Sequence, residues 1–314
     1  MNVFRRGVPD LGPVTVGGVT LRNPVMTASG TAGHDTELAH RMDLAGLGAV
    51  VVKSLHVDPW PGNPAPRVHV AGNGMLNAVG LEGPGAAVWC NDSLPRLEAV
   101  GATVVASIWG RSVEEYAAAA RALSSVGSRI AAVEVNLSCP NLEGRNSIFA
   151  HDAELSARVV STVCNEVGVP VWAKLSANTD RVVAVAEAVA GAGAPAVTLI
   201  NTMLGLQVDT ASARPVLGNG GGGLSGPPIH AVAVRAVHDV AREIPSLDII
   251  GVGGVSCGAD AVEMIMVGAK AVQVGTATFA RPDACARVLR QAAVLLDRRG
   301  ARTWHSVHRL ALAG

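Results

Sequence analysis

Residues 102–139 read ATVVASIWGRSVEEYAAAARALSSVGSRIAAVEVNLSC, and this stretch decides the fold. Two apolar, β-branched runs, 102–110 and 131–139, flank an alanine-rich segment at 113–127 whose apolar residues recur with the helical period. A strand, a helix and a second strand in this order predict a βαβ unit with parallel strands. Because both runs are nearly continuous in apolar residues, each strand is expected to be covered on two faces.

The same strand and helix rhythm repeats along nearly the whole chain. Further apolar runs predict strands at 24–30, 49–55, 170–177, 196–202, 248–255 and 271–277, which makes eight in all. Segments of helical period lie at 152–167, 181–193, 227–243, 259–269 and 282–299. This pattern predicts an α/β fold, a closed (β/α)8 TIM barrel, with an open doubly wound sheet as the alternative. No linker interrupts residues 1–314, so we expect a single domain.

One short hairpin and two long insertions depart from the rhythm. Residues 14–24, VTVGGVTLRNP, predict an N-terminal hairpin that turns at Gly17-Gly18 and closes the bottom of the barrel. Residues 56–85 and 203–228 are rich in Gly, Pro and Asn and are long for βα loops. Extended βα loops of this length are expected to cover a site at the top of the barrel.

Composition argues against several classes of protein. The chain balances 25 basic against 25 acidic residues without a run of like charge, which argues against a nucleic-acid partner. Its five cysteines are scattered without a CxxC pair, so we expect free thiols, no metal site and no iron-sulfur cluster of its own. Residues 1–13 lack the apolar core of a signal peptide, and 188–208 read as a helix end, a turn and a strand. We therefore expect a cytoplasmic protein that binds a small neutral or anionic ligand, with no membrane partner.

Polar residues gather where the predicted strands end. In a TIM barrel the carboxyl ends of the strands and the loops that follow form the active site. These ends carry Ser29, Lys53-Ser54, Ser107, Asn136 to Cys139, Lys174, Asn201-Thr202, Gly253-Gly254 and Gly275-Thr276. The chain has only three lysines, and two of them, Lys53 and Lys174, are in this set. Because an unpaired ammonium is costly to bury, both lysines predict a bound anion or polar cofactor.

The glycines and one cysteine carry further signals. Gly253-Gly254 and Gly275-Thr276 at the ends of the last two strands are typical of a phosphate cradle, whereas a lone Ser or Asn at a strand end is more often a helix cap. Four cysteines are expected to be small buried apolar residues: Cys90, Cys164, Cys257 and Cys285. Cys139 differs, because it ends a strand in a polar loop where a thiol can meet a substrate. With a reference pKa of about 8.5, such a thiol works as a base after local tuning or with an alkaline optimum.

Motifs from end to end resemble those of the class 1 dihydroorotate dehydrogenases, most of all the class 1B flavoprotein subunit. They are NPVMTASGTAG (23–33), VVKSLHVDPWPGNPAPRV (51–68), GMLNAVGLEGPG (74–85), VEVNLSCPN (133–141), WAKLSANTD (172–180), VTLINTMLG (197–205), GGLSGPPI (222–229), IIGVGGV (249–255) and VQVGTATF (272–279). Class 2 relatives use serine as the base and carry an N-terminal membrane-binding extension. This chain resembles class 1 in having Cys139 and no such extension.

The resemblance implies FMN at the barrel mouth, with dihydroorotate or orotate stacked on its ring, in de novo pyrimidine biosynthesis. Cys139 falls at the position of the catalytic base. Residues at flavin-contact positions are Ser29, Lys53, Ser54, Ser107, Asn136, Lys174, Ile200, Gly226, Gly253, Gly254, Gly275 and Thr276. Residues at substrate positions are Lys53, Asn77, Ala78, Val79, Gly80, Leu81, Asn136, Asn201 and Thr202. Class 1B further implies an electron-transfer subunit with FAD and an iron-sulfur cluster, in a homodimer or heterotetramer.

The residue types suit this chemistry. A pyrimidine dione presents alternating N–H and C=O groups, which the amides of Asn77, Asn136 and Asn201 can read. In the implied oxidation, Cys139 removes a proton from the carbon next to the C4 carbonyl while hydride leaves the adjacent carbon for FMN. Lys174 stabilises the negative charge that develops on the reduced flavin.

Three departures from the family pattern leave alternatives open. Ser107 stands where the family commonly has asparagine, Glu82-Gly83 replace the usual Gln-Asn, and Arg145 and Asn146 occur in an altered loop at 142–150. A related flavin enzyme acting on another dihydropyrimidine or a specialised metabolite is the first alternative. A non-catalytic FMN-binding barrel is the second. The physiological electron acceptor is left open by the sequence.

Overall fold

The computed structural model describes residues 9–138 and 148–312, and its centre is an eight-stranded parallel sheet. The strand order is β3-β16-β15-β10-β9-β8-β7-β4, and a parallel bridge between Met26 and Ala49 joins the two edge strands. The sheet therefore closes, which confirms the predicted (β/α)8 barrel. The strands are β3 (Val25–Thr27), β4 (Val50–Val51), β7 (Val104–Ile108), β8 (Ala132–Asn136), β9 (Val171–Lys174), β10 (Ala196–Leu199), β15 (Asp248–Val252) and β16 (Ala271–Val274).

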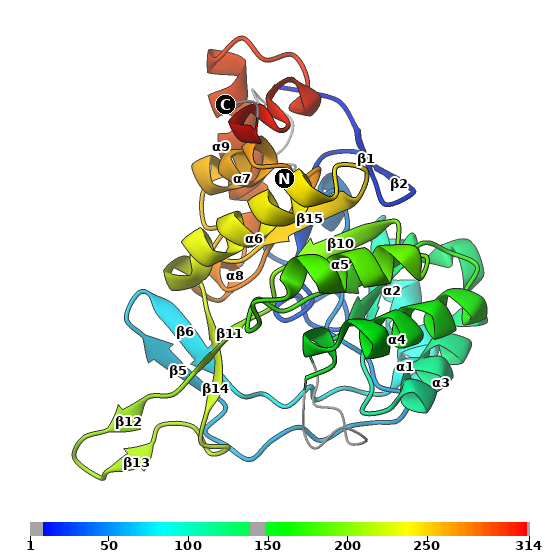
Figure 1. The fold of residues 1–314 in the computed structure, drawn as a ribbon, viewed down its shortest axis with the longest axis vertical. Helices are drawn as coiled ribbons and strands as arrows, with labels where there is room; N and C mark the ends of the chain where they lie inside the picture. The colour runs from blue at the N-terminus through cyan, green and yellow to red at the C-terminus, as the bar shows by residue number, and fades with distance from the viewer. Residues whose placement is uncertain (1–8, 139–147, 313–314) are drawn as a thin grey trace.

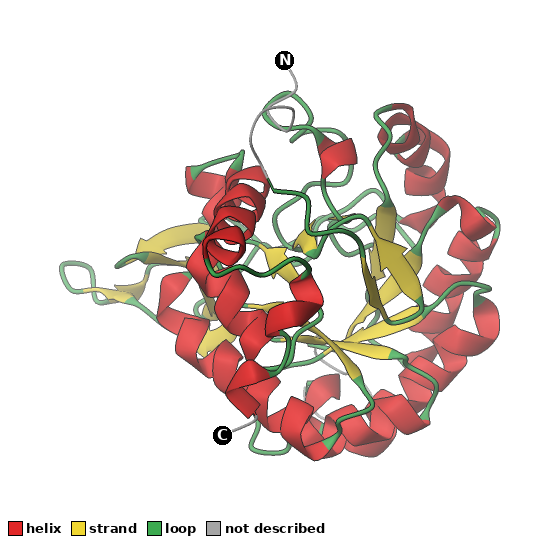
Figure 2. Ribbon diagram, turned by 90° about the horizontal axis from the view of Figure 1, so that it is seen from above, coloured by secondary structure: helices red, strands yellow, loops and turns green. Residues whose placement is uncertain are grey.

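Helices form a ring outside these strands (Figure 1, Figure 2). They are α1 (Ala86–Asp92), α2 (Leu94–Ala99), α3 (Val113–Ser124), α4 (Ala153–Glu166), α5 (Val182–Gly191), α6 (His230–Glu243), α7 (Gly258–Met266), α8 (Ala277–Ala280) and α9 (Ala284–Arg298). Short 3-10 helices are η2 (Leu44–Gly46), η3 (Gly127–Arg129), η4 (Phe149–His151), η5 (Pro227–Ile229), η6 (Trp304–Val307) and η7 (Leu310–Leu312). The Ser112 and Asp152 side chains cap α3 and α4, as strand-to-helix turns commonly require.

The N-terminal hairpin forms the floor of the barrel, as predicted. Its strands β1 (Val14–Val16) and β2 (Val19–Leu21) are antiparallel, and their apolar side chains join those of the barrel interior in one buried cluster. The indole Nε1 of Trp172, on β9, donates a hydrogen bond of 3.0 Å to the carbonyl of Gly17. The floor is thus packed and apolar, which leaves the opposite end of the barrel for chemistry.

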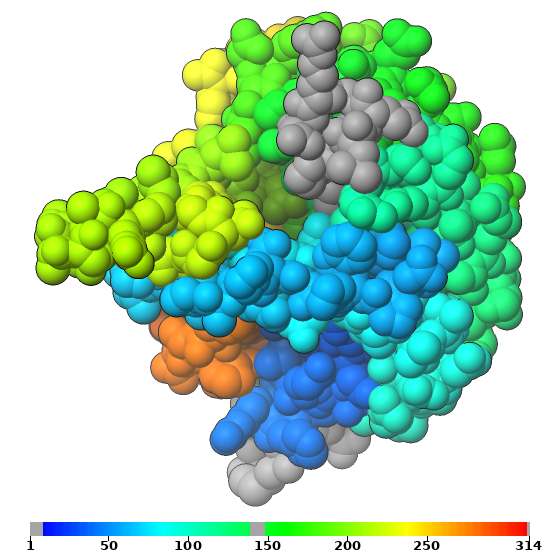
Figure 3. All heavy atoms as spheres, turned by 90° about the horizontal axis from the view of Figure 1, so that it is seen from below, coloured from blue at the N-terminus to red at the C-terminus, as the bar shows by residue number. Residues whose placement is uncertain are grey.

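The two long insertions pair with each other rather than forming separate loops. Strands β5 (Val68–Ala71) and β6 (Gly74–Asn77) come from the first, and β11 (Met203–Gly205) and β14 (Gly222–Ser225) from the second. They form one antiparallel sheet in the order β11-β14-β6-β5, from which β12 (Val208–Asp209) and β13 (Arg214–Pro215) project as an arm (Figure 1). Figure 3 shows the molecule from below the view of Figure 1. Residues 56–85 (light blue) run across the face seen there, and the β12–β13 arm reaches beyond it.

The tight floor gives a prediction about Gly17. Gly17 has φ +52°, and an added Cβ would lie 2.3 Å from Trp172 Nε1. Gly72 has a similar φ of +62° but no atom within 4 Å of an added Cβ. Gly17→Ala is therefore expected to lower the free energy of unfolding by about 1–3 kcal/mol more than Gly72→Ala, because both carry backbone strain and only the first is overpacked. Urea unfolding followed by circular dichroism measures the difference, and equal losses would contradict a packed floor.

Candidate active site

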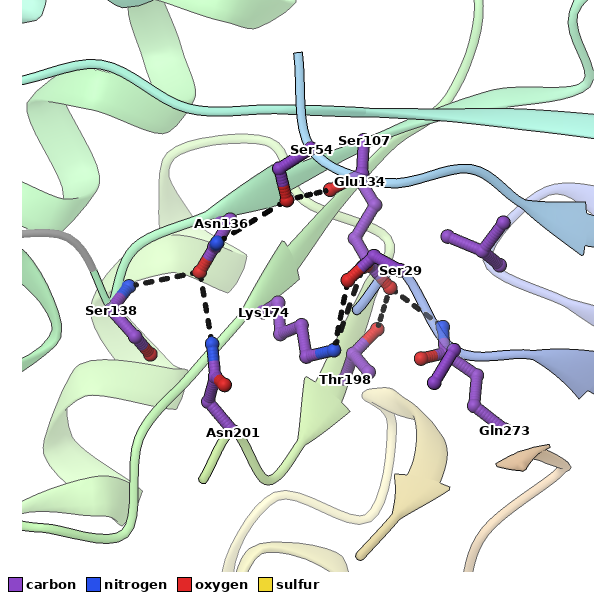
Figure 4. A network of polar contacts seen from close by, with 12 residues as sticks. Ser29, Ser54, Ser107, Glu134, Asn136, Ser138, Lys174, Thr198, Asn201 and Gln273 are labelled. Atoms are coloured by element: carbon purple, nitrogen blue, oxygen red, sulfur yellow. Dashed lines mark hydrogen bonds and ion pairs between the residues drawn. The ribbon is translucent and has the colours of Figure 1, made fainter. Parts of the chain in front are cut away.

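Residues at five strand ends lie at the mouth of the barrel, opposite the floor. Ser29 follows β3, Lys53 follows β4, Asn136 and Lys174 are the last residues of β8 and β9, and Asn201 follows β10. Figure 4 shows four of them, Ser29, Asn136, Lys174 and Asn201, facing a common space. The structure brings these four residues together from distant parts of the sequence, because parallel strands place all their carboxyl ends together.

Asn136 is the centre of a hydrogen-bond network. Its Oδ1 accepts from the Asn201 side-chain amide (3.0 Å) and from the Ser138 backbone N–H (3.2 Å), and its Nδ2 donates to Ser54 Oγ (3.3 Å). Ser54 Oγ also shares a hydrogen bond of 2.9 Å with Ser107 Oγ. The Ser107 hydroxyl therefore belongs to the network, although it stands in place of a larger amide. These bonds fix the two amide side chains at the mouth before any ligand binds.

Lys174 is the buried cation of the site, with 4 % of its surface exposed. Its Nζ donates to Ser29 Oγ at 3.1 Å and lies 3.9 Å from Glu134 Oε1 (Figure 4). An ammonium has three donors. The described residues thus engage one of them at hydrogen-bond distance, so the group has donors to offer an anionic or carbonyl ligand above it.

The predicted substrate segment, Asn77 to Leu81, lies at the end of β6 beside the mouth. Asn77 Nδ2 donates to the carbonyl of Gly223 on β14 (3.1 Å). A Cβ on Gly223 would lie 2.1 Å from Thr202 Oγ1, so Asn77, Gly223 and Thr202 lie next to one another in space. Ala78 and Val79 accept backbone or side-chain bonds from Asn63, and Gly80 and Leu81 both have positive φ, at 76° and 60°. The segment therefore presents its backbone in a fixed turn.

Three glycine loops meet at another part of the rim. Gly226, Gly253 and Gly254 have φ of 88°, 129° and 69°. A Cβ on Gly254 would lie 3.0 Å from the Gly226 carbonyl, and one on Gly226 would lie 3.3 Å from Thr276 Cγ2, next to Gly275. The 14-residue helix α6 starts just beyond Gly226, after η5. Bare amides beside a helix N-terminus suit a phosphate or another anion. Ile200, at the end of β10, lies 3.5 Å from the Cβ position of Gly253.

Lys53 lines a separate part of the mouth, a cavity of about 620 Å³ shared with His34, Trp60, Glu82 and Gly83. Burial lowers the pKa of Lys53, and the nearby Glu82 carboxylate opposes that shift. Glu82 of this cavity pairs with Arg67, and a Cβ on residue 83 would lie 2.9 Å from His34 Nε2. Within the described part of the chain, neither Lys53 Nζ nor His34 Nε2 has a hydrogen-bond partner.

His34 gives a prediction about pH. Burial lowers its pKa to about 4, and the charge of Lys53 acts in the same direction. The unfolded chain, with an ordinary His pKa of about 6.5, takes up this proton first, so the free energy of unfolding falls as the pH drops from 6.5 towards 4. His34→Gln is expected to flatten that fall, by less than the limiting slope of about 1.4 kcal/mol per pH unit because the ring is partly exposed. Urea midpoints measured from pH 7 to 4 provide the readout. The exposed His40 supplies a matched control, His40→Gln, which is measured over the same pH range.

The predicted base, Cys139, lies outside the described residues, as do Arg145 and Asn146. The other cysteines are free thiols, but the expectation of burial is right only for Cys90 and Cys285. Cys164 and Cys257 are half-buried. Cys257 lies at the N-cap of α7, where its backbone N–H donates to Asp260.

The structure also places residues at the site that the strand-end rule did not select. Glu134, Thr198 and Gln273 lie inside the barrel, one layer below the rim. Asn178 holds the loop after β10, donating to the Thr202 carbonyl and accepting from the Leu204 N–H. A polar residue inside an otherwise apolar strand, as in AVEVN and AVQVG, is the sequence signal that would have found two of them.

Two negative findings apply to residues 9–138 and 148–312. No helix there combines the length and apolarity that crossing a membrane requires. No group of three or more His, Cys, Asp or Glu side chains in those ranges is placed to hold a metal ion.

A closed parallel barrel with a buried lysine and paired amides at its mouth belongs to the class of (β/α)8 barrels, whose active sites lie at this end of the sheet. Comparison with known proteins narrows the class. The dihydroorotate dehydrogenase family profile matches residues 13–296. Three similar relatives are each named dihydroorotate dehydrogenase B (NAD(+)), catalytic subunit. That of Desulforudis audaxviator is 46 % identical over 92 % of this chain and 94 % of its own, and that of Citrifermentans bemidjiense is 44 % identical over 90 % and 92 %. That of Bacillus thuringiensis is 40 % identical over 91 % and 92 %. The chain belongs to the dihydroorotate dehydrogenase family.

Proposed function

We propose that this chain oxidises dihydroorotate to orotate in pyrimidine biosynthesis, using FMN bound at the barrel mouth. The observation that supports this function best is the meeting of the buried Lys174 with the Asn136–Asn201 amide pair at one rim, in a chain of this family. The relatives are named as dihydroorotate dehydrogenases, which supports the same substrate for this chain.

The residues present fit FMN. The glycine loops at Gly226, Gly253-Gly254 and Gly275 offer bare backbone where an added Cβ would meet neighbouring atoms within 3.3 Å. That cradle suits a terminal phosphate. Lys174 has unused donors for a ring carbonyl or a ring nitrogen that carries negative charge. When bound, FMN would supply the acceptor for the hydride that leaves the substrate.

The remaining chemistry is performed by the chain's own side chains. Asn136 and Asn201 are held by mutual hydrogen bonding, so their free amide atoms are oriented to read the N–H and C=O groups of a pyrimidine ring. Lys53, which has no partner in the described part of the chain, is the cation for the substrate carboxylate. Cys139 receives the proton from the carbon next to the C4 carbonyl. Lys174 provides the fixed positive charge in a dry site, where charge stabilisation is strongest.

The relatives are called catalytic subunits, and that name is the support for a partner subunit. We propose that the partner carries FAD and an iron-sulfur cluster and passes electrons onward, within a homodimer of this chain or a heterotetramer. No CxxC pair occurs in the sequence, so the cluster is assigned to the partner.

Purified protein tests the function directly. It is expected to be yellow from bound flavin, and dihydroorotate should bleach it anaerobically and sustain turnover with an artificial electron acceptor. A flavin-loaded protein that dihydroorotate leaves oxidised, while another dihydropyrimidine reduces it, would move the assignment to that substrate. Protein that binds no flavin would contradict the proposal.

A further inference from the structure

The barrel interior contains a polar layer directly above its apolar floor. Ala132, Trp172, Ala196 and Ala271 belong to the floor cluster. Two residues further along the same strands come Glu134, Lys174, Thr198 and Gln273, which face the same interior because strand side chains alternate. Lys174 is 4 % exposed and the other three are fully buried. Four strands therefore each contribute one polar side chain to a dry compartment.

The layer contains one acid and one base. Among the buried polar and charged side chains of the described residues, Glu134 is the only carboxylate and Lys174 the only ammonium. The groups that face Lys174 are Glu134 and Asn136 from β8, Thr198 from β10, Gln273 from β16 and Ser29 after β3 (Figure 4). Glu134 is thus the one titratable neighbour of that lysine in this set.

The carboxylate of Glu134 is held in an asymmetric way. Its Oε2 accepts from Gln273 Nε2 (2.6 Å) and from Thr198 Oγ1 (3.0 Å). Its Oε1 accepts no hydrogen bond from the described residues and lies 3.9 Å from Lys174 Nζ. Side chains from two other strands of the barrel, β10 and β16, therefore fix one oxygen, and the other oxygen is the one nearest the ammonium.

The distance between the two charges is informative. A charge-assisted hydrogen bond between an ammonium and a carboxylate normally closes to about 2.7–2.9 Å. Here the ammonium bonds Ser29 at 3.1 Å and stays 3.9 Å from the carboxylate, on the side of the mouth. An ion pair that served stability alone would close that gap. The arrangement supplies a compensating charge while leaving ammonium donors for a ligand.

We propose that Glu134 is a positioning residue for the flavin site: its fixed carboxylate balances the charge of Lys174 inside the dry barrel and holds the ammonium at the mouth. Burial without a counter-charge favours the neutral amine. A neutral amine would offer no positive charge to a ligand that gains negative charge. The identity of that ligand as FMN rests on the proposed function, whereas the pairing of Glu134 with Lys174 does not.

The small number of lysines makes a direct test practical. In flavin-loaded protein labelled with ¹³C at lysine Cε, NMR would report three side-chain signals, which Lys174→Met and Lys270→Met assign. Glu134→Gln, which keeps shape and removes charge, is expected to lower the proton affinity of Lys174 at least tenfold, so that the Lys174 signal titrates at least one pH unit lower. Glu134→Asp should restore part of that affinity. The control Thr198→Val removes a hydrogen bond without changing charge and should alter the affinity less than threefold.

The flavin provides a second readout that a merely structural role would not move. At a pH where Glu134→Gln has lost the Lys174 proton, the ratio of affinities for reduced and oxidised flavin should fall at least tenfold, equivalent to about 30 mV in midpoint potential for a two-electron couple. Lys174 titrating within threefold of the unsubstituted protein in Glu134→Gln would overturn the proposal. If that variant does not fold, Glu134→Met, which also removes the carboxylate, is titrated in its place and judged by the same threefold limit. Protein without flavin would contradict the proposed function, and the Lys174 titration in that protein would still decide the pairing.

Discussion

Replacing Cys139 with alanine is expected to slow the reduction of bound flavin by dihydroorotate by about 10²- to 10⁴-fold, the usual contribution of a general base. The thiol is the residue assigned to accept the substrate proton, and alanine offers no atom for it. Flavin binding should persist, because the glycine cradle and Lys174 belong to other strands. Stopped-flow measurement of the loss of oxidised-flavin absorbance under anaerobic conditions gives the rate.

Cys164 supplies the matched control for this experiment. It is a free, half-buried thiol on α4, and burial raises its pKa, so Cys164→Ala should leave the reduction rate unchanged. The unsubstituted enzyme should also reduce its flavin faster as the pH rises towards the ordinary thiol pKa of about 8.5. Equal reduction rates in the Cys139→Ala and unsubstituted proteins would refute the assignment of the base.

Lys174→Met is expected to affect both chemistry and stability. Loss of a preorganised charge at the point where negative charge develops should lower the flavin reduction rate by about 10²- to 10³-fold. Glu134 would remain buried without its counter-charge, which should lower the free energy of unfolding by about 3–5 kcal/mol. Urea unfolding and anaerobic reduction measure the two effects separately.

Two further variants serve as controls for Lys174→Met. Lys270 pairs with Asp248 and is 39 % exposed, near the barrel floor, so Lys270→Met should cost no more than about 1 kcal/mol and leave reduction unchanged. The double variant Lys174→Met/Glu134→Gln removes both charges and should regain much of the lost stability without regaining the rate. A single variant as stable as the unsubstituted protein would show that Glu134 does not depend on Lys174.

The barrel could be predicted from sequence because its strands are buried on both faces and read as apolar runs. The same logic brought Ser29, Asn136, Lys174 and Asn201 to one rim, since parallel strands end together. The antiparallel sheet β11-β14-β6-β5 could not be predicted this way, because β6 and β14 pair residues that lie 146 to 150 positions apart and no local pattern records such a partner. Helices α1 and α2 were missed as well, because both are short, Ser93 separates them and Pro95 lies in the first turn of α2.

The polar layer was missed for a different reason. The rule that selects polar residues at strand ends does not select Glu134, Thr198 or Gln273. These residues lie within strands, as single polar residues in apolar runs. Their meaning depends on the curvature that brings β8, β10 and β16 together around one space. Sequence periodicity indicates that each side chain faces inward, but only closure of the barrel shows that they meet.

The N-terminal hairpin closes the barrel at one end. Because Val16, Val19 and Leu21 pack against Trp172 and Ile250 in one buried cluster, the floor offers no path for solvent. Exchange between the polar layer and bulk water must then occur through the mouth. Under the proposed function, substrate, product and the released proton all pass through this one opening. The product therefore has to dissociate before the next substrate can bind.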